Sequence, residues 1–294
     1  MRILVTGGAG FIGHELVRRL VVNGHHIAVT VHTHKPTVEG VETYEIDVRD
    51  TRKTRIVVTE FNPDVIVHAA AMSDADVCER SPDEAHEVNV GGTKNVIAAN
   101  DGIDAHIIFL SSSFVFSGEK EFCEETGNRS PINVYGETKV AAEDIVNDSI
   151  YSSTIIRTDQ PYGWPEPWQE SDMVAWTVDQ LKQPGTVEVF KEWWNNPIYL
   201  PDLVESIRVL IEECREGIFH AVGPDFINRF QWAVEIARVF GYDQDRIVPI
   251  STAEADLPAV RPNVRLSPDK LERCIESKIR PVRDGVKRMR ELTV

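Results

Sequence analysis

The chain has 294 residues, of which 42% are hydrophobic and 27% charged, a composition typical of a globular protein with a sizeable core. Its formal net charge of −16 excludes nucleic acid and anionic membrane surfaces as expected partners, because both would be repelled. No apolar run approaches the roughly 20 residues of a membrane-spanning helix, and the N-terminus enters a strand pattern without the succession of a signal peptide.

A glycine-rich turn follows the first predicted strand. The β-branched run Arg2–Thr6 leads into this turn, and residues 14–22 carry helical spacing. Strand, glycine turn and helix form, in that order, the fingerprint of dinucleotide binding: glycines let the backbone approach a pyrophosphate, and the helix N-terminus offers amide donors. A merely tight turn is the alternative. The predicted cofactor contacts here are Gly7, Gly10, Phe11, Ile12 and Gly13.

The end of the second predicted strand bears on the choice of cofactor. The strand His26–Val31 is followed by His32, Thr33, His34 and Lys35, where an NAD enzyme usually carries an acid that holds the ribose 2′-hydroxyl. An acid would repel a 2′-phosphate, so its absence favours NADP(H), while NAD(H) stays open. We expect His32 and Thr33 at the ribose; a solvated loop is the alternative.

A third strand is predicted over residues 43–46, followed by a helix over residues 51–60. Asp47 and Val48, directly after the strand, are placed where they could meet the adenine. A role in capping the following helix, for Asp47 or for Asp50, explains these acids at least equally well.

A buried strand is predicted within residues 63–71. It opens into Ala69, Ala70 and Ala71, small residues that allow a cofactor to pass close to the backbone. Met72 follows them and is expected on the substrate side.

Serines end the next predicted strand. A helix over residues 82–100 and a strand over residues 106–110 precede Ser111, Ser112 and Ser113. Hydroxyls at the C-terminal end of a parallel strand face the crevice in which ligands bind, although turn chemistry is an alternative reason for a serine run.

Tyr135 and Lys139 lie four residues apart on a helix predicted over residues 133–147, so the phenol and the ammonium can share one face. A phenol has a pKa of about 10, and acid–base work at neutral pH requires a value nearer 7, a difference of about 4 kcal/mol. A neighbouring ammonium supplies that difference by stabilising the phenolate. The spacing alone also occurs by chance, but its context here favours an acid–base pair.

The alternation of strands and helices, up to a sixth strand at residues 154–157, predicts an α/β fold with a Rossmann-type doubly wound parallel sheet. Beyond Pro161 the chain becomes rich in Pro and Trp. Helices are predicted there over residues 171–182, 202–213 and 228–240, and strands over residues 187–190 and 217–222. We expect residues 1–160, rejoined by about 197–216, to form the dinucleotide-binding domain, and residues 161–196 and 217–294 to form a smaller α+β substrate lobe.

The glycine turn, Asn89-x-x-x-Thr93, Ser112 and Tyr135-x-x-x-Lys139 together resemble an extended short-chain dehydrogenase/reductase. Within that superfamily the chain is similar to the dTDP-4-dehydrorhamnose reductase branch, which includes the regulatory β subunit of methionine adenosyltransferase. The similarity runs over nearly the whole chain. Its branch-level marks are Pro63-Asp64-Val65-Ile66-Val67-His68-Ala69-Ala70-Ala71, Ser111-Ser112-Ser113-Phe114-Val115-Phe116-Ser117-Gly118, Asn133-Val134-Tyr135-Gly136-Glu137-Thr138-Lys139 and Arg261-Pro262-Asn263.

The resemblance implies a role for each matched residue. Tyr135 would be the general acid/base, Lys139 would lower its pKa and hydrogen-bond the nicotinamide ribose, and Ser112 would hydrogen-bond the substrate carbonyl. Hydride from the nicotinamide would then reduce a sugar ketone. Gln160 is placed at the cofactor, no metal is implied, and the residues placed at the substrate are Met72, Ser113, Phe114, Trp194 and Arg261.

The chain departs from the branch in the sugar pocket. The rhamnose-pathway reductases usually carry Asp-Tyr after the catalytic hydroxyl, where this chain has Ser113 and Phe114. They usually place a Trp after the sixth strand, where this chain has Asp159 and Gln160. Such changes alter hydrogen bonds that discriminate between substrates, so the particular sugar is left open.

Three functions are compatible with these residues. The first is an NADP(H)-linked reductase of a sugar ketone, with a free or nucleotide-linked sugar as the small-molecule partner. The second is an epimerase, dehydratase or free-sugar dehydrogenase of the same superfamily, and the third is a catalytically silent, cofactor-binding regulatory subunit. By analogy with the superfamily we expect a homodimer.

The four cysteines, Cys78, Cys123, Cys214 and Cys274, lack metal-ligand spacing and are expected to be reduced thiols in a cytoplasmic protein. The acidic, lysine-poor composition is also compatible with a salt-adapted cytoplasm, although many acidic proteins are not halophilic.

Overall fold

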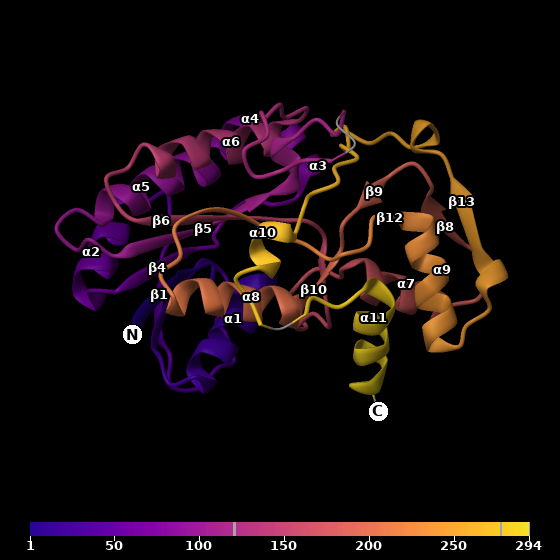
Figure 1. The fold of residues 1–294 in the computed structure, drawn as a ribbon, viewed down its shortest axis with the longest axis horizontal. Coiled ribbons are helices and arrows are strands. Elements are labelled where there is room, and N and C mark those ends of the chain that lie inside the picture. The colour runs from indigo at the N-terminus through magenta and orange to yellow at the C-terminus, as the bar shows by residue number, and fades with distance from the viewer. Residues whose placement is uncertain (120–121, 277, 294) are drawn as a thin grey trace.

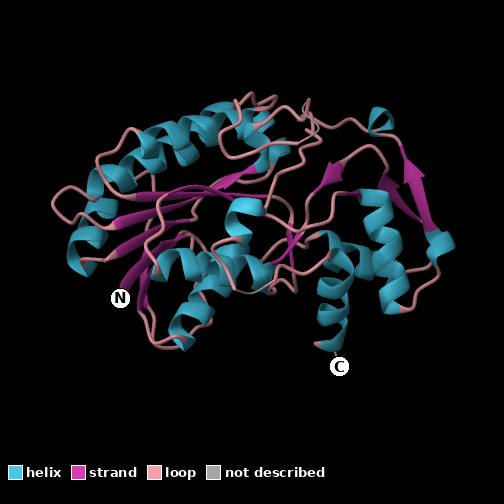
Figure 2. Cartoon of the chain, viewed as in Figure 1, coloured by secondary structure: helices cyan, strands magenta, loops and turns pink. Residues whose placement is uncertain are grey.

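The computed structural model describes residues 1–119, 122–276 and 278–293. Within these residues, a seven-stranded parallel sheet has the strand order β11-β6-β5-β4-β1-β2-β3 (Figures 1 and 2). The order reverses between β1 and β4, and in such sheets ligands bind at this reversal, beyond the carboxyl ends of the strands. The strands are β1 (Arg2–Thr6), β2 (His26–Val31), β3 (Glu42–Glu45), β4 (Val65–His68), β5 (His106–Ser112), β6 (Ser153–Thr158) and β11 (Gly217–Ala221).

Helices cover both faces of this sheet (Figure 1). Side chains alternate along each strand, so Leu4 packs with the helices of one face, while Ile3 and Val5 pack with those of the other. The first face carries α2 (Thr51–Phe61), α5 (Gly92–Ala99) and α6 (Val134–Asn147). The second face carries α1 (Phe11–Val22), α8 (Leu200–Glu212) and the short α10 (Asp269–Glu272).

Three short helical segments connect β4 to α5. They are α3 (Ala75–Arg80), α4 (Pro82–His86) and the π-helical turn η1 (Glu87–Gly91). The helix predicted over residues 82–100 is therefore interrupted by a π turn, a distortion that helical periodicity does not reveal. A 3-10 turn, η2 (Ser113–Val115), follows β5.

The smaller lobe has its own apolar core, which includes Tyr162, Val178, Trp232 and Val286. Its helices are α7 (Met173–Lys182), α9 (Arg229–Phe240) and α11 (Val282–Glu291), with 3-10 turns η3 (Gln244–Arg246) and η4 (Thr252–Glu254). Its short strand pairs are β7 (Pro161–Tyr162) with β10 (Ile198–Tyr199), β9 (Trp194–Asn195) with β12 (Ile227–Asn228), and β8 (Val187–Phe190) with β13 (Ile247–Ile250). None of the described helices combines the length and the apolar character needed to span a bilayer.

The Rossmann-type α/β fold predicted from the sequence is confirmed. The strand predicted over residues 217–222 was assigned to the smaller lobe, and this assignment is wrong, because β11 pairs in parallel with β6, from Gly217 opposite Thr154 to Ala221 opposite Thr158. The chain returns to the large sheet through α8 before it enters the lobe again. We therefore propose a larger domain of residues 1–160 and 200–221 with α10, and a lobe formed by the remainder.

A buried ion pair ties α6 to the sheet. Glu143 on α6 is fully buried, and its Oε2 lies 2.7 Å from Arg157 Nη2 on β6. Ser111 on β5 donates to Glu143 Oε1 at 2.5 Å, and Arg129 lies 3.2 Å from Oε2. Removal of one partner leaves the other charge buried and unpaired, which is far more costly than loss of an exposed pair.

We predict that Glu143→Gln lowers the free energy of unfolding by about 3–5 kcal/mol, because Arg157 loses its buried counter-charge. The matched control is Asp144→Asn, one residue further on, where the lost pair with Arg129 is half exposed and worth less than about 1 kcal/mol. Urea unfolding followed by tryptophan fluorescence measures both. Equal losses in the two variants would contradict the stabilising role of the buried pair.

Candidate active site

The glycine turn brings β1 against the segment that follows β4. Gly7 has a φ of +69°, and a Cβ there would lie 2.8 Å from the nitrogen of Ala70. A Cβ at Gly13 would lie 2.3 Å from the carbonyl oxygen of Gly7, so both positions require glycine. Gly10 is the N-cap of α1, and no side chain of the described residues caps this helix. The helix start at Phe11 therefore offers backbone amides to an anion, which fits a pyrophosphate.

A loop of the smaller lobe contacts this turn. The carbonyl oxygen of Ala9 accepts hydrogen bonds from Trp168 Nε1 and Gln169 Nε2, both at 3.0 Å. His34, beyond the end of β2, stacks on Trp168 with ring centroids 6.4 Å apart. The turn is thus in contact with both parts of the molecule.

Hydrogen bonds hold the end of β4 at the reversal of strand order. Thr6 Oγ1 lies 2.7 Å from His68 Nδ1 and accepts from the amides of Ala69 and Ala70, each at 3.2 Å. On the other side of the ring, His68 Nε2 lies 3.1 Å from Thr93 Oγ1. Burial, assisted by a nearby ammonium, lowers the pKa of His68 to about 3, so the ring is neutral. This network fixes the alanine segment beside the glycine turn.

Asn89, in the π turn η1, joins that segment to α6. Its Oδ1 accepts from the amide of Met72 at 2.8 Å, and its Nδ2 donates to the Met72 carbonyl at 3.0 Å and to Thr138 Oγ1 at 2.9 Å. Thr138 in turn donates to the carbonyl of Tyr135 at 2.7 Å. Asn89 therefore links the backbone at Met72 to the helix turn that carries Tyr135.

Ser112 and Tyr135 meet where β5 ends and α6 begins. Asn133 caps α6 by accepting from the amide of Gly136 at 2.8 Å, which positions Tyr135 on the first turn. The Ser112 hydroxyl is hydrogen-bonded to the Tyr135 phenol, and it accepts from the amide of Phe114 at 3.2 Å. The Phe114 ring packs edge-on against Tyr135, with centroids 5.6 Å apart.

Burial controls the protonation of the Tyr–Lys pair. It raises the pKa of Tyr135 to about 12, and the hydrogen bond with Ser112 acts in the opposite direction. It lowers the pKa of Lys139 to about 8, against the influence of Glu143, and the ammonium lies 4.5 Å from the centroid of Phe109. The pKa of Tyr135 is thus shifted opposite to the direction predicted from the Tyr–Lys spacing, because loss of hydration dominates.

The residues predicted at the ribose and adenine lie together. His32 and Thr33 are exposed after β2, and His32 Nε2 lies 3.7 Å from Asp47 Oδ2. The hydrogen bond from Arg49, with Nη2 2.6 Å from Asp47 Oδ2, lowers the pKa of the Asp47 carboxyl. The N-cap of α2 is Asp50, whose side chain accepts a hydrogen bond from the backbone amide of Lys53. The capping alternative therefore applies to Asp50 and not to Asp47.

Val48 is buried at the junction of β3 and α5. A Cβ at Gly92 would lie 2.8 Å from Val48 Cγ2, so glycine is needed for this packing. Asn95 on α5 donates to the Val48 carbonyl at 2.8 Å. The predicted contact of Val48 with an adenine stays a prediction.

A tryptophan of the smaller lobe reaches the Tyr135 site. Trp193 packs in an apolar cluster with Phe114 and Tyr135, whereas Trp194 stacks on Phe226 at 5.4 Å. Consecutive residues of an extended chain point to opposite sides, so only one of the two rings can face the site. The structure places Trp193 beside Tyr135, and the predicted contact of Trp194 with the substrate stays a prediction.

Arg261 approaches the same ring from the C-terminal part of the chain. Its guanidinium lies 5.2 Å from the Trp193 centroid, and its Nη2 lies 2.7 Å from Asp76 Oδ2. Arg261 is thus close to the predicted site, and its charge is paired.

A buried polar cluster at the end of β6 joins the predicted residues Ser113 and Gln160 to Asp159 and Arg229, which were not predicted at the site. Asp159 Oδ1 accepts from the Ser113 hydroxyl at 3.0 Å, and Oδ2 accepts from the amide of Asn196 at 2.7 Å. Gln160 has a φ of +40°, and its side-chain oxygen accepts from the buried Arg229. Asp159 directly follows β6, the neighbour of β5, so its position after a predicted strand could have indicated that it lies near Ser112 and Ser113. No comparable signal marks Arg229, which lies far along the chain.

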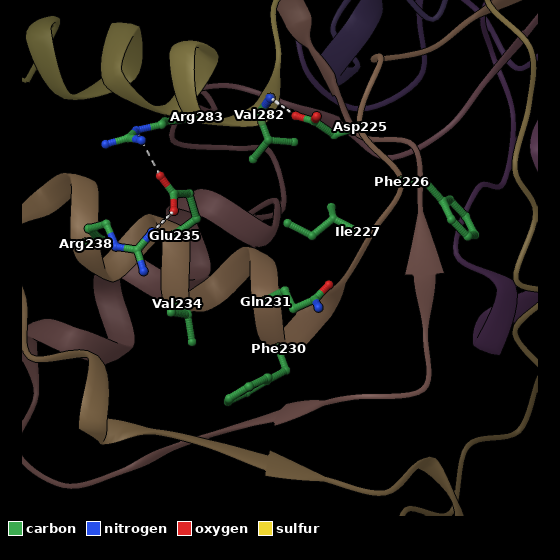
Figure 3. A pocket seen from close by; sticks show the side chains of 10 residues that line it. All are labelled: Asp225, Phe226, Ile227, Phe230, Gln231, Val234, Glu235, Arg238, Val282 and Arg283. Carbon is green, nitrogen blue, oxygen red and sulfur yellow. Dashed lines mark hydrogen bonds and ion pairs between the residues drawn. The ribbon is translucent and has the colours of Figure 1, made fainter.

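A separate pocket of about 540 Å³ lies on the smaller lobe, between α9, α11 and the segment before β12 (Figure 3). Ile227 and Val234 supply apolar walls, and Glu235 lies between Arg238 at 2.7 Å and Arg283 at 3.3 Å. The predicted catalytic, cofactor and substrate residues are absent from its lining. Glu235 is paired with two arginines and Asp225 accepts from the Val282 amide, so we assign the chemistry to the Tyr135 site.

The family described as RmlD substrate binding domain matches residues 1–293. The chain belongs to this family. The dTDP-4-dehydrorhamnose reductase of Mycolicibacterium smegmatis is 29% identical over 289 residues, covering 96% of this chain and 82% of that protein. The methionine adenosyltransferase 2 subunit beta of Mus musculus is 28% identical over 294 residues, covering 97% of this chain and 86% of that protein.

The RmlD-family fold is shared with a solved structure, the Bacillus anthracis dTDP-4-dehydrorhamnose reductase in complex with NADP. Its TM-score is 0.86 at 24% identity, covering 100% of this chain and 99% of that chain. This likeness concerns the fold. The resemblance to the dTDP-4-dehydrorhamnose reductase branch, predicted from the motifs, is confirmed by the family match and by the relatives.

We predict that Gly7→Ala abolishes measurable dinucleotide binding, because its Cβ displaces the Ala70 backbone at the turn. Gly24→Ala is the matched control, since Gly24 has a similar φ of +78° but no atom within 4 Å of the added Cβ. Both variants lose about 1 kcal/mol or more of stability to backbone strain. Calorimetric titration with NADPH separates them, and undiminished binding to Gly7→Ala would remove the turn from the cofactor site.

Proposed function

We propose that this RmlD-family chain is an NADP(H)-linked reductase of a keto group on a nucleotide-linked sugar. The observation that carries the proposal is the placement of Ser112 at the end of β5 beside Tyr135 on the first turn of α6, with Lys139 one helical turn further along. The glycine turn and the uncapped start of α1 lie at the same edge of the sheet and fit a pyrophosphate. The M. smegmatis relative, a dTDP-4-dehydrorhamnose reductase, supports the substrate class.

The protonation states suit the reducing direction. With a pKa of about 12, the Tyr135 phenol is protonated at neutral pH and can donate to a forming alkoxide. Ser112 can hydrogen-bond the ketone oxygen, and Lys139, with a pKa of about 8, is largely cationic at pH 7. When bound, the reduced nicotinamide supplies the hydride. The residues that would hold the cofactor are those of the glycine turn, the alanine segment after β4, and the ends of β2 and β3.

A second candidate is a silent regulatory subunit, favoured by the similarity to the methionine adenosyltransferase subunit beta over 97% of this chain. Both candidates bind a dinucleotide. They differ in turnover, so addition of dTDP-4-dehydrorhamnose to protein and NADPH, followed by absorbance at the nicotinamide band, decides between them. Oxidation of NADPH supports the reductase. Binding without oxidation contradicts it, and an epimerase is then recognised by conversion of a nucleotide sugar without net change in the cofactor.

We predict that Tyr135→Phe lowers kcat by about 100-fold or more while the Kd for NADPH changes less than about two-fold, because the variant lacks only the proton donor. The matched control is Tyr151→Phe, which removes a phenol in the segment between α6 and β6 and should leave both constants unchanged. Steady-state kinetics and calorimetry measure them. Retained activity in Tyr135→Phe would remove this residue from the acid–base role.

We predict that Thr33→Asp shifts the preference from NADPH toward NADH by about 10-fold or more, because the carboxylate repels a 2′-phosphate and can accept from a 2′-hydroxyl. Thr33→Asn, of the same size without the charge, is the control. The ratio of kcat/KM for the two cofactors reports the shift. An unchanged ratio in Thr33→Asp would show that the 2′-position lies elsewhere.

The homodimer and the cytoplasmic location expected from the sequence stay predictions. Light scattering of the purified chain measures the oligomeric state.

A further inference from the structure

We propose that Ser113 and Asp159, which directly follow β5 and β6, form a recognition pair for the hydroxyl next to the ketone of the sugar. Ser113 touches the sugar, and Asp159 acts through Ser113 as a positioning residue. The proposal rests on the proposed reductase function and names the substrate feature that the site recognises.

The placement of the pair follows from strand register. Ser112 and Thr158 lie opposite each other at the ends of β5 and β6. The residues that follow them, Ser113 and Asp159, are both buried and are joined by a hydrogen bond of 3.0 Å from Ser113 Oγ to Asp159 Oδ1. Ser113 and Asp159 are therefore bonded neighbours just beyond the carboxyl ends of two adjacent strands.

The direction of this hydrogen bond decides what Ser113 can bind. A hydroxyl has one proton and two acceptor lone pairs, and Ser113 gives its proton to Asp159. Its oxygen is left as an acceptor, which suits a hydroxyl of the substrate and not a carbonyl. Ser112 is one residue earlier, so its Cα atom lies about 3.8 Å from that of Ser113. Ser112 interacts with Tyr135 and is the residue that would hydrogen-bond the ketone oxygen. On a 4-keto sugar, the hydroxyl nearest to the ketone is the one on C3.

The surroundings of Asp159 keep it available as an acceptor. The groups that face it are the Asn196 amide, the Asn195 side chain, Ser113 and the Arg229 guanidinium from α9. Burial raises the pKa of Asp159 to about 6, while these donors and the Arg229 charge act in the opposite direction. The carboxylate is therefore ionised at pH 8 and becomes protonated as the pH falls through about 6.

The polar groups around the pair are incompletely satisfied. Arg229 lies 4.1 Å from the Trp193 centroid, donates to Gln160, and its charge also interacts with Asp172 and Arg261. Its Nε, the Trp193 Nε1 and the Asn195 Oδ1 are buried without a hydrogen-bond partner among the described residues. Buried polar atoms are usually paired, so these three atoms are available to a polar ligand.

The first test compares Ser113→Ala with wild type on two substrates, dTDP-4-dehydrorhamnose and its 3-deoxy analogue. We expect kcat/KM to fall by about 10- to 100-fold on the hydroxylated substrate, mainly through KM, and by less than about three-fold on the analogue. Ser117→Ala, beyond the 3-10 turn, is the matched control. Equal losses on both substrates would overturn the assignment.

The second test uses pH and a relocated carboxylate. For wild type we expect KM for the hydroxylated sugar to rise as pH falls through about 6, and for Asp159→Asn we expect a high KM that does not change with pH. The double variant Ser113→Asp/Asp159→Ser should recover kcat/KM relative to either single variant, because it again has one carboxylate and one hydroxyl that can hydrogen-bond each other at this position. A wild-type KM independent of pH, or a double variant as impaired as the combined singles, contradicts the pairing.

A binding measurement separates this proposal from the reductase function. If wild type oxidises NADPH with neither substrate, the reductase proposal fails. Calorimetric titration of the protein with dTDP-rhamnose and its 3-deoxy analogue, with NADP⁺ present, then tests the pair directly. Recognition of the hydroxyl appears as tighter binding of dTDP-rhamnose that Ser113→Ala removes, and equal binding of both sugars overturns it.

Discussion

The position of α6 on the sheet is the constraint on which the site depends, and the buried pair of Glu143 and Arg157 holds it. The carboxylate is shared by the guanidinium of β6 and the Ser111 hydroxyl of β5, so one side chain joins three elements. A buried pair of this kind adds little net stability compared with apolar packing, but it tolerates few other arrangements. Because Lys139 lies one turn before Glu143, the same contact sets where the ammonium stands relative to Ser112.

A second set of polar contacts positions the opposite wall. The π turn directs the Asn89 side chain toward both Met72 and Thr138. The side-chain amide of Asn89 hydrogen-bonds the backbone of Met72, in the segment after β4, and also the Thr138 hydroxyl on α6. Without the extra residue of the π turn, a regular helix would direct this side chain elsewhere. The two walls of the site are therefore held by hydrogen bonds between elements that are distant in sequence. The neutral His68 adds to them by linking Thr6 on β1 to Thr93 on α5.

The electrostatics of the site follow from the depth at which it is built. Burial raises the pKa of Tyr135 and lowers that of Lys139, so the loss of hydration acts on both in favour of their neutral forms. A protonated phenol is the form needed to deliver a proton to an alkoxide. The same burial raises the pKa of Asp159, and there Arg229 provides the opposing charge from the smaller lobe.

The sequence by itself determined the order of strands and helices, the glycine turn and the shared helix face of Tyr135 and Lys139. These features depend on local periodicity and on the conformational freedom of glycine, which neighbouring residues report. Only the tertiary structure decided that β11 joins the large sheet, that Trp193 and not Trp194 faces Tyr135, and that Asp159 meets Ser113. Each of these depends on a contact between distant segments, and the pKa of Tyr135 depends on how much water their packing excludes.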